Sequence, residues 1–212
     1  INNPIYSILG NHDYQLNPFA QIIYNKNNWI MPNWYFNKDF DNTECWFLDT
    51  CQLVTLGDLE GNNDKGHVTK KMIENTHNNS FENIRNKQIK WLTESLESSS
   101  KKNKIVVGHY PLISFGFHQE DSVEELYKLL FPIFKKYNVS HYFCGHDHNI
   151  QSIILTEDNY KLNHIIIGNT CHNSIDFQSP HYFYNDTCCY GVYDTETEIV
   201  TIHDSTNYKK QL

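Results

Sequence analysis

Three short segments of the chain combine a glycine with residues that can bind a metal ion. Residues 10–13 read Gly-Asn-His-Asp, residues 108–111 read Gly-His-Tyr-Pro, and residues 145–148 read Gly-His-Asp-His. Each segment follows a short apolar run of strand character, so all three are expected at the carboxyl ends of strands, where ligands and catalytic groups collect in α/β folds. A single Gly-His pair after a strand is an ordinary structural feature. Three such segments, one of them with a His-x-His spacing, favour a metal centre.

The side chains in these segments suit a centre with two metal ions. His146 and His148 are two residues apart in an expected turn, so they could reach two neighbouring ions. Asn11, His109 and His146 would offer one oxygen and two nitrogen donors to a divalent ion, a shell that lacks a bridging carboxylate. Two ions about 3.5–4 Å apart clamp a phosphate group and lower the pKa of a bound water. The pattern therefore predicts hydrolysis of a phosphate ester.

The elements that must position these segments read as strands alternating with helices. Residues 85–96 carry apolar side chains on one helical stripe. A Ser-x-x-Glu capping box at residues 122–125 opens a second helix, in which Pro132 is expected to cause a kink. Turns are expected at residues 156–159 and 194–197, within a terminal meander of consecutive strands. The predicted strands are residues 6–9, 105–107, 142–144, 152–155, 162–167, 190–193 and 198–202.

Length and charge restrict the class of protein. A chain of 212 residues can bury one sizeable core, and no linker or internal repeat divides residues 1–212, so we expect a single α/β domain. The net charge is −8 and the basic residues form no stripe, which makes nucleic acid an unfavoured partner. No stretch approaches the roughly 18 consecutive apolar residues of a membrane helix. An acidic protein that handles phosphate would need metal ions to balance charge.

The cysteines and possible glycosylation sites bear on the compartment. The six cysteines have no zinc-finger spacing. Cys45 and Cys51 could form a disulfide with each other or with the Cys188–Cys189 region, whereas Cys144 reads as a buried thiol. Asn-x-Ser/Thr triplets begin at residues 78, 138 and 185, although an asparagine-rich chain produces such triplets by chance. These features favour a secreted protein or one of a secretory, lysosome-like compartment.

The three histidine segments resemble the last three motifs of the calcineurin-like metallophosphoesterases, and within them the purple (tartrate-resistant type) acid phosphatases. The resemblance covers nearly the whole chain, because residues 47–50 (Phe-Leu-Asp-Thr), residues 88–92 and the terminal strands also fall where that family has similar segments. It implies a two-sheet β sandwich flanked by helices. It also implies that Asn11, His109 and His146 hold the divalent metal and that His148 holds iron(III).

The same resemblance suggests roles around the metals. His12 would bind the substrate phosphate or protonate the leaving oxygen, and Asp13 would orient His12. His118 falls where animal members carry a histidine that lines the substrate pocket and helps to protonate the leaving group; the alternative is an exposed loop imidazole. Asp147 is interpreted as structural. Four other histidines are interpreted as surface or core residues: His67, His77, His141 and His203. His172 and His181 are interpreted as packing residues, and a wall of the substrate pocket is their less favoured role.

The departure from the family lies at the front of the chain. The family's Asp-x-Gly and Gly-Asp-x-x-Tyr motifs, which precede Gly-Asn-His-Asp and supply the iron's aspartate, the bridging aspartate and a tyrosinate, are not present. Residues 57–60 (Gly-Asp-Leu-Glu) imitate the second motif but follow residues 10–13, so we interpret them as a loop. The chain then corresponds to the carboxyl-terminal two-thirds of the catalytic domain, with the N-terminal strands absent. With His148 as the one remaining iron ligand, this chain alone is expected to hold iron poorly.

The resulting functional hypothesis is an acid phosphatase that hydrolyses phosphate monoesters with iron(III) and a divalent iron, zinc or manganese ion. Its substrate would be a phosphorylated small molecule or a phosphoprotein. Two alternatives stay open: a non-catalytic scaffold or binding protein of the same fold, and a phosphodiesterase or nucleotidase that uses the same centre. The oligomeric state is open. Hydrolysis of a monoester compared with a diester would separate these readings.

Overall fold

A seven-stranded sheet forms the centre of the molecule. The computed structural model describes residues 3–24, 28–58, 67–116, 124–168, 182–183, 188–204 and 209–211. The strand order in the central sheet is β3-β4-β5-β6-β8-β7-β9, with parallel pairing of β4 to β5, β5 to β6 and β6 to β8 and antiparallel pairing elsewhere. Its strands are β3 (Phe36–Phe40), β4 (Thr43–Phe47), β5 (Asn103–Val107), β6 (His141–Cys144), β7 (Ile150–Glu157), β8 (Tyr160–Ile167) and β9 (Tyr182–Phe183).

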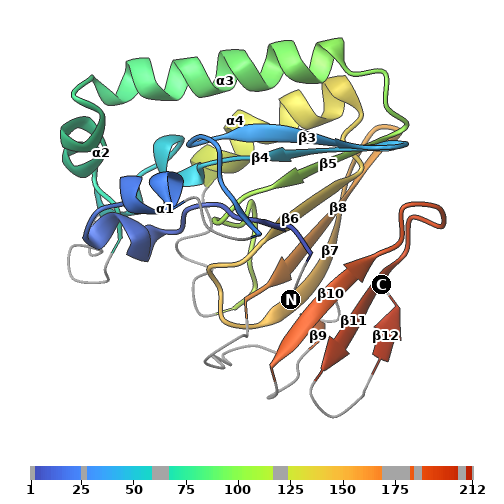
Figure 1. Ribbon diagram of the computed structural model, residues 1–212. Helices are drawn as coiled ribbons and strands as arrows, with labels where there is room; N and C mark the ends of the chain where they lie inside the picture. Colours follow the sequence, from blue (N-terminus) through green and yellow to red (C-terminus); the bar gives the residue numbers. More distant parts are fainter. Residues whose placement is uncertain are drawn as a thin grey trace.

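Two long helices, α3 (Phe81–Ser98) and α4 (Glu124–Tyr137), cover one face of this sheet (Figure 1). The indole nitrogen of Trp46 in β4 donates to the Ser95 hydroxyl of α3 over 2.8 Å, and Phe134 of α4 packs against Tyr142 of β6. The helix predicted over residues 85–96 begins earlier, because the side chain of Ser80 accepts the N–H of Asn83 and caps it. The second helix continues through Pro132, and the capping serine predicted at residue 122 lies outside the described residues.

A second, three-stranded sheet packs on the opposite face. It contains β10 (Cys189–Tyr193), β11 (Val200–Asp204) and β12 (Lys209–Gln211) in that order. Ile150 and Ile165 of the central sheet pack with Val200 and Ile202 of the second sheet in a separate small core. The predicted α/β fold with two sheets and flanking helices is therefore confirmed. The terminal meander was wrong in one respect: both turns form, but the β7–β8 hairpin belongs to the central sheet and the β10–β11 hairpin to the second.

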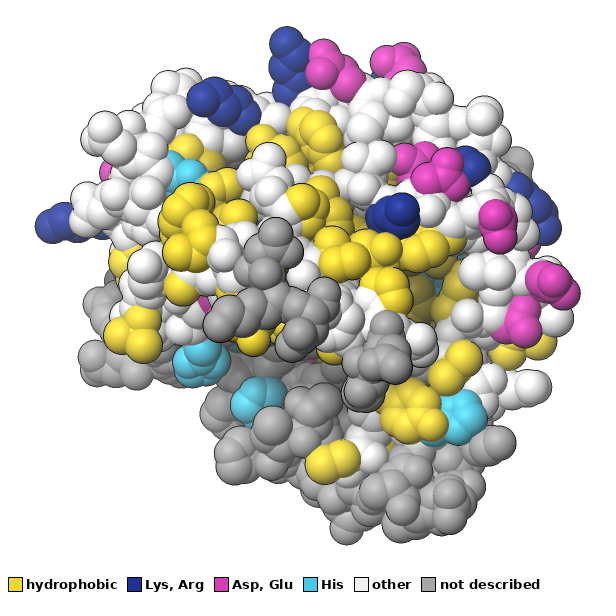
Figure 2. All heavy atoms as spheres, viewed as in Figure 1, with side chains coloured by type: hydrophobic (Ala, Val, Ile, Leu, Met, Phe, Trp, Pro, Cys, Tyr) yellow, Lys and Arg dark blue, Asp and Glu magenta, His cyan; other side chains and the backbone are white. Residues whose placement is uncertain are grey.

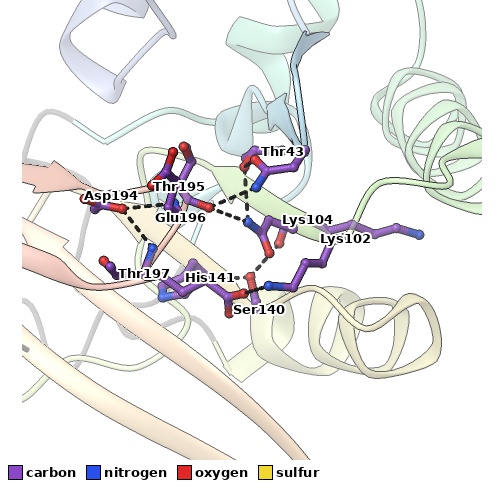
Figure 3. Close-up of polar contacts among 12 residues, drawn as sticks. Thr43, Lys102, Lys104, Ser140, His141, Asp194, Thr195, Glu196 and Thr197 are labelled. Atoms are coloured by element: carbon purple, nitrogen blue, oxygen red, sulfur yellow. Dashed lines mark hydrogen bonds and ion pairs between the residues drawn. The ribbon is translucent and has the colours of Figure 1, made fainter.

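The turn between β10 and β11 attaches the second sheet to the amino ends of the central parallel strands (Figure 3). The side-chain amides of Asn42 and Asn103 both donate to the carbonyl of Thr195, over 3.1 and 3.0 Å. Lys102 forms an ion pair with Glu198 over 2.7 Å. Because these contacts occupy the amino ends of the strands, the carboxyl ends are left to the histidine segments.

The beginning of the chain forms a small separate sheet. β1 (Ile5–Tyr6) pairs in parallel with β2 (Trp29–Ile30), so the predicted strand over residues 6–9 is shorter and lies outside the central sheet. Between the two strands lie a 3-10 helix, η1 (Asn11–Gln15), and the short helix α1 (Phe19–Ile23). No residue of α1 is buried. On the face of the molecule drawn in Figure 2, hydrophobic side chains are spread over the middle and charged side chains of both signs lie along the edge.

The remaining elements lie between β4 and α3 in the chain. They are the 3-10 helices η2 (Thr50–Gln52) and η3 (Leu56–Asp58) and the helix α2 (Lys70–His77). Cys45, Cys51 and Cys144 carry free thiols. The disulfides left open for Cys45 and Cys51 are therefore not formed, whereas the buried thiol predicted for Cys144 is confirmed. The described helices include none that combines the length and the hydropathy of a membrane span.

Candidate metal centre

The carboxyl ends of β5 and β6 bring two histidine segments together. The strands are parallel neighbours, with Val107 paired to Phe143, so the loops that follow them leave the sheet side by side. The N–H of Gly108 donates to the carbonyl of Phe143, and the N–H of Gly145 donates to the carbonyl of His109. The predicted position of these two segments is therefore confirmed. Parallel pairing sets their relative position, because each strand ends at the same edge of the sheet.

Three donor atoms converge at this edge. Asn11 Oδ1 lies 2.8 Å from His109 Nε2, and His146 Nδ1 lies 3.3 Å from the same nitrogen. Asn11 and His146 are buried, and His109 is half-buried. One amide oxygen and two imidazole nitrogens form a donor set that suits a divalent ion such as zinc, manganese or iron(II). The structure thus brings together the three residues predicted to hold the divalent metal.

Two glycines are required for this close approach. A Cβ atom on Gly10 would lie 2.9 to 3.1 Å from three atoms of the His109 ring. A Cβ on Gly108 would lie 2.3 Å from the Tyr142 hydroxyl oxygen and 2.7 Å from Thr50 Cγ2. Any larger residue at Gly108 would therefore push the His109 backbone out of place, which explains the glycine before this histidine.

Buried side chains from three other elements hold the loop that carries His109. Thr50 Oγ1 accepts the N–H groups of His109 and Tyr110. The Tyr142 hydroxyl donates to the carbonyl of Tyr110 over 2.6 Å. His164 Nε2, in the middle of β8, accepts the N–H groups of Leu112 and Ile113 over 2.9 and 3.3 Å.

The role of His164 was missed by the sequence analysis, which treated it as one residue of an apolar strand. The position of a histidine within that apolar run was the one sequence feature that could have indicated a buried, hydrogen-bonded imidazole. Burial lowers the pKa of His164 from 6.5 to about 3, so its imidazole is neutral in acid and Nε2 remains an acceptor. This residue anchors the far side of the His109 loop.

Replacing His164 by phenylalanine is expected to destabilise the protein, because the ring volume is kept while two buried N–H groups lose their acceptor. Each buried donor without a partner costs about 1–3 kcal/mol, so for two donors we expect a loss of roughly 2–6 kcal/mol of unfolding free energy. Denaturant unfolding measures this loss. The control is His203→Phe in β11, where the imidazole is stacked on Tyr190 and a ring can replace a ring. Equal unfolding midpoints for the two variants would contradict this role of His164.

The loop of residues 145–149 is shaped by a second buried polar cluster. His146 has a positive φ of 65°, a conformation uncommon for residues other than glycine. Next to it, Asp147 is fully buried and accepts hydrogen bonds from the hydroxyl of Ser114 and the amide of Gln151. The side-chain oxygen of Gln151, Oε1, accepts the N–H of Phe115 over 2.8 Å. Asp147 is therefore used to hold this loop, as predicted.

His12 and Asp13 lie beside the three donors, at the start of η1. The imidazole of His12 is exposed. Asp13 accepts the N–H of Gly10 over 2.8 Å and the amide of Gln21 over 3.1 Å, so its carboxylate closes the first turn of η1. Within the described residues no hydrogen bond joins Asp13 to His12. The described contacts of Asp13 are therefore with Gly10 and Gln21, and its orientation of His12 stays a prediction.

The structure places some of the other histidines near the three donors and does not describe the rest. His148 is half-buried in the same loop as His146. His118, His172 and His181 lie outside the described residues. His67, which the sequence analysis set aside, is buried, and its ring centroid is 5.6 Å from that of His146. In the segment of residues 57–60 that imitates a family motif, Asp58 accepts the N–H of Lys70, a structural use.

A buried polar network lies behind the donors. Asp49 is fully buried and accepts hydrogen bonds from the Tyr14 hydroxyl, the N–H of Cys51 and the side-chain amide of Gln52. Burial raises the pKa of Asp49 to about 7, although these hydrogen bonds oppose the shift. Since Tyr14 belongs to η1, the network ties the segment of Asn11 to the end of β4.

Within the described residues, the convergent donors are those of one ion. In the part of the chain that the structure describes, no group of three or more histidine, cysteine, aspartate or glutamate side chains is placed to hold a metal. The convergent set reaches three donors because one of them is the amide oxygen of Asn11. The described residues therefore fit one divalent ion.

Comparison with known proteins finds a family and relatives that match most of the chain. The family model for the calcineurin-like phosphoesterases matches residues 1–149. The tartrate-resistant acid phosphatase type 5 of Mus musculus is 30% identical over 175 residues, which cover 79% of this chain and 49% of that protein. Purple acid phosphatase 17 of Arabidopsis thaliana is 33% identical over 150 residues, covering 69% of this chain and 41% of the relative. The chain spans about half the length of the curated relatives it matches.

Solved structures share the fold. A structure described as GAP50, the anchor in the inner membrane complex of Plasmodium, superposes with a TM-score of 0.70 at 21% identity and covers 99% of this chain and 65% of its own. The purple acid phosphatase PPD1 from yellow lupin (Lupinus luteus) seeds has a TM-score of 0.56 at 13% identity, covering 89% and 33%. At these identities the likeness shows the fold alone.

Proposed function

Because the chain belongs to the calcineurin-like phosphoesterase family, we propose that it takes part in the hydrolysis of phosphate monoesters at a binuclear metal centre, as an acid phosphatase. The observation that carries this proposal is the convergence of Asn11 Oδ1, His109 Nε2 and His146 Nδ1 within hydrogen-bonding distance. The fold could exist without these donors. Their approach depends on Gly10 and Gly108, whose replacement by larger residues the structure would not accommodate.

The proposed ligand assignment follows the donor chemistry. Asn11, His109 and His146 would hold a divalent iron, zinc or manganese ion, and His148 would contribute to a second site for iron(III). Such a pair of ions supplies positive charge for the phosphate group and acidifies a water molecule when it is bound. Relatives of this family use binuclear metal centres; the identity of the ions in this chain is part of the proposal.

His12 is the residue proposed to act directly on the substrate. It follows Asn11 in η1 and its imidazole is exposed, so it can contact a phosphate that approaches the donors. In this proposal the oxygen of a water attacks phosphorus, the ester P–O bond breaks, and the leaving oxygen receives a proton through the His12 ring. One proton of the water stays on the phosphate, and the other returns to His12 through the solvent. His118, outside the described residues, is proposed for the same phosphate pocket.

Residues 1–212 would form one catalytic domain that acts on a phosphorylated small molecule or a phosphoprotein. A secreted or lysosome-like location accords with the exposure of Asn78 and Asn138, which begin two of the possible glycosylation triplets.

Hydrolysis of a monoester and a diester by the purified chain tests the proposal. The chain is loaded with iron, zinc or manganese and assayed with p-nitrophenyl phosphate and bis(p-nitrophenyl) phosphate at acid and neutral pH. We expect hydrolysis of the monoester in acid, its loss after treatment with a chelator, and its return when metal is added. Preference for the diester would instead assign a phosphodiesterase. Hydrolysis of neither substrate by metal-loaded protein would favour a scaffold.

A further inference from the structure

A second cleft lies away from the three convergent donors, none of which lines it. It has a volume of about 200 Å³ and is formed where the end of α2 and the first turns of α3 meet η2 and the segment before β3. The side chains that matter for its chemistry are Trp34, Gln52, His77, Asn79 and Lys87. Neither the predicted motifs nor the proposed hydrolysis uses this cleft.

The charge of the cleft is unusual for a chain with a net charge of −8. No aspartate or glutamate lines it. Lys87 also lines a neighbouring hollow with Asn79, Asn83, Asn86 and Lys90, which again contains no carboxylate. Among the described residues, no carboxylate lies within ion-pair distance of Lys87, whereas Lys90 on the next turn pairs with Glu94. Within the described part of the chain, the exposed Lys87 therefore brings a positive charge to both hollows that no carboxylate pairs with.

His77 lines the cleft together with Lys87, and its ring carries an N–H that can donate a hydrogen bond. Gln52 is fully buried, and its Nε2 donates to Asp49 Oδ2 over 2.9 Å and contacts His77 Nε2 over 3.1 Å. Since an amide nitrogen only donates, His77 Nε2 is the acceptor, and we assign its proton to Nδ1. The ring of Trp34 packs on His77 with centroids 4.3 Å apart, which fixes the imidazole.

We propose that this cleft binds an oxyanion, the phosphate or carboxylate group of a small molecule, through the Lys87 ammonium, the His77 Nδ1–H and the Asn79 amide. Charge-assisted hydrogen bonds from such donors to an oxyanion are stronger than those between neutral groups. Trp34 provides an apolar wall for the rest of the molecule. The inference goes beyond the proposed hydrolysis and does not depend on it.

The imidazole of His77 reports binding directly. In the chain without a ligand, burial and the nearby Lys87 charge lower the pKa of His77. An anion bound beside the ring favours the imidazolium and raises that pKa. The experiment is an NMR titration of the His77 imidazole in the full chain, first with inorganic phosphate and then with acetate. We expect saturable binding of at least one anion with a rise in the pKa of His77. A response to phosphate identifies a phosphate group as the ligand, and a response to acetate identifies a carboxylate.

Matched variants make the result specific. Lys87→Gln is expected to weaken anion binding roughly tenfold or more, since it removes a charged donor. Lys90→Gln is the control, because Lys90 already has a carboxylate partner, and it should leave the response unchanged. His109→Ala should keep the His77 response even if hydrolysis is lost, which separates this cleft from the candidate metal centre. No His77 response to either anion, or an unchanged response in Lys87→Gln, would overturn the proposal.

Discussion

Alanine in place of His109 or His146 is expected to abolish both retention of a divalent metal and monoester hydrolysis. Each variant removes one of the three convergent donors and leaves two, which do not fill a divalent shell. Loss of a residue that only supports a ligand typically costs 10- to about 100-fold in metal affinity or activity, so loss of a ligand should cost more. Metal content per chain and kcat/KM, measured on the same folded sample, give the two readouts.

Two further variants separate a metal ligand from a residue that acts on substrate. His12→Ala should keep its divalent metal and lower kcat, most strongly for substrates with poor leaving groups, because the exposed His12 is proposed to protonate the leaving oxygen. His203→Ala, in β11 of the second sheet, should change neither quantity. Full metal content and full activity in His109→Ala or His146→Ala would remove the basis of the proposed function.

The second large effect is expected in the pH dependence of stability. Burial raises the pKa of Asp49 from 3.8 to about 7. Between these values the folded protein holds a proton that the unfolded chain has released, so the contribution of Asp49 is greatest below pH 4 and declines as the pH rises to 7. A rise of this size corresponds to roughly 4 kcal/mol. Asp49→Asn, which does not titrate, should lack this decline.

The difference in unfolding free energy between the wild type and Asp49→Asn isolates the effect. This comparison is needed because His164, whose pKa is lowered to about 3, contributes the opposite slope: its stabilisation is present above pH 6.5 and is lost as the pH falls. The stability of the wild type relative to the variant should fall by about 1.4 kcal/mol per pH unit between pH 4 and 7. Parallel curves of unfolding free energy against pH for the wild type and Asp49→Asn would contradict the raised pKa of Asp49.

Tyr14→Phe provides a matched test of the same network. The Tyr14 hydroxyl donates to Asp49 and opposes the rise in the pKa of that carboxyl. Without this hydrogen bond the pKa of Asp49 should rise above about 7, and the declining part of the stability curve should extend to higher pH. Because Tyr14 lies in η1 with Asn11, metal retention in this variant also measures how strongly the network supports the donor.

Local sequence was sufficient to locate His109 and His146. A short apolar run followed by glycine and histidine marks the carboxyl end of a buried strand, and such runs can be read without tertiary information. The helical stripe of residues 85–96 and the turns at residues 156–159 and 194–197 were predictable for the same reason. Parallel pairing of β5 and β6 then follows from the α/β pattern, which places both histidines at one edge of the sheet.

Contacts between distant parts of the chain decided the rest. Asn11 reaches His109 across 98 residues of sequence, from a segment outside the central sheet. Asp13 bonds the nearby Gly10, and the buried imidazole of His164 anchors the His109 loop across 52 residues. No periodicity encodes such pairings, because they depend on which polar group is buried beside which loop.

The same distinction explains the errors in the second half of the chain and among the cysteines. The strands predicted after residue 148 form, but an alternating pattern does not say to which sheet a strand belongs. β10 and β11 belong to a separate sheet that packs on one face of the central sheet. The sequence left a disulfide of Cys45 or Cys51 open, whereas both thiols are free in the folded chain. The sequence by itself determined the strand-end histidines and the family; only the tertiary structure decided which side chains converge on them, since burial and long-range hydrogen bonds arise when the sheets and helices pack.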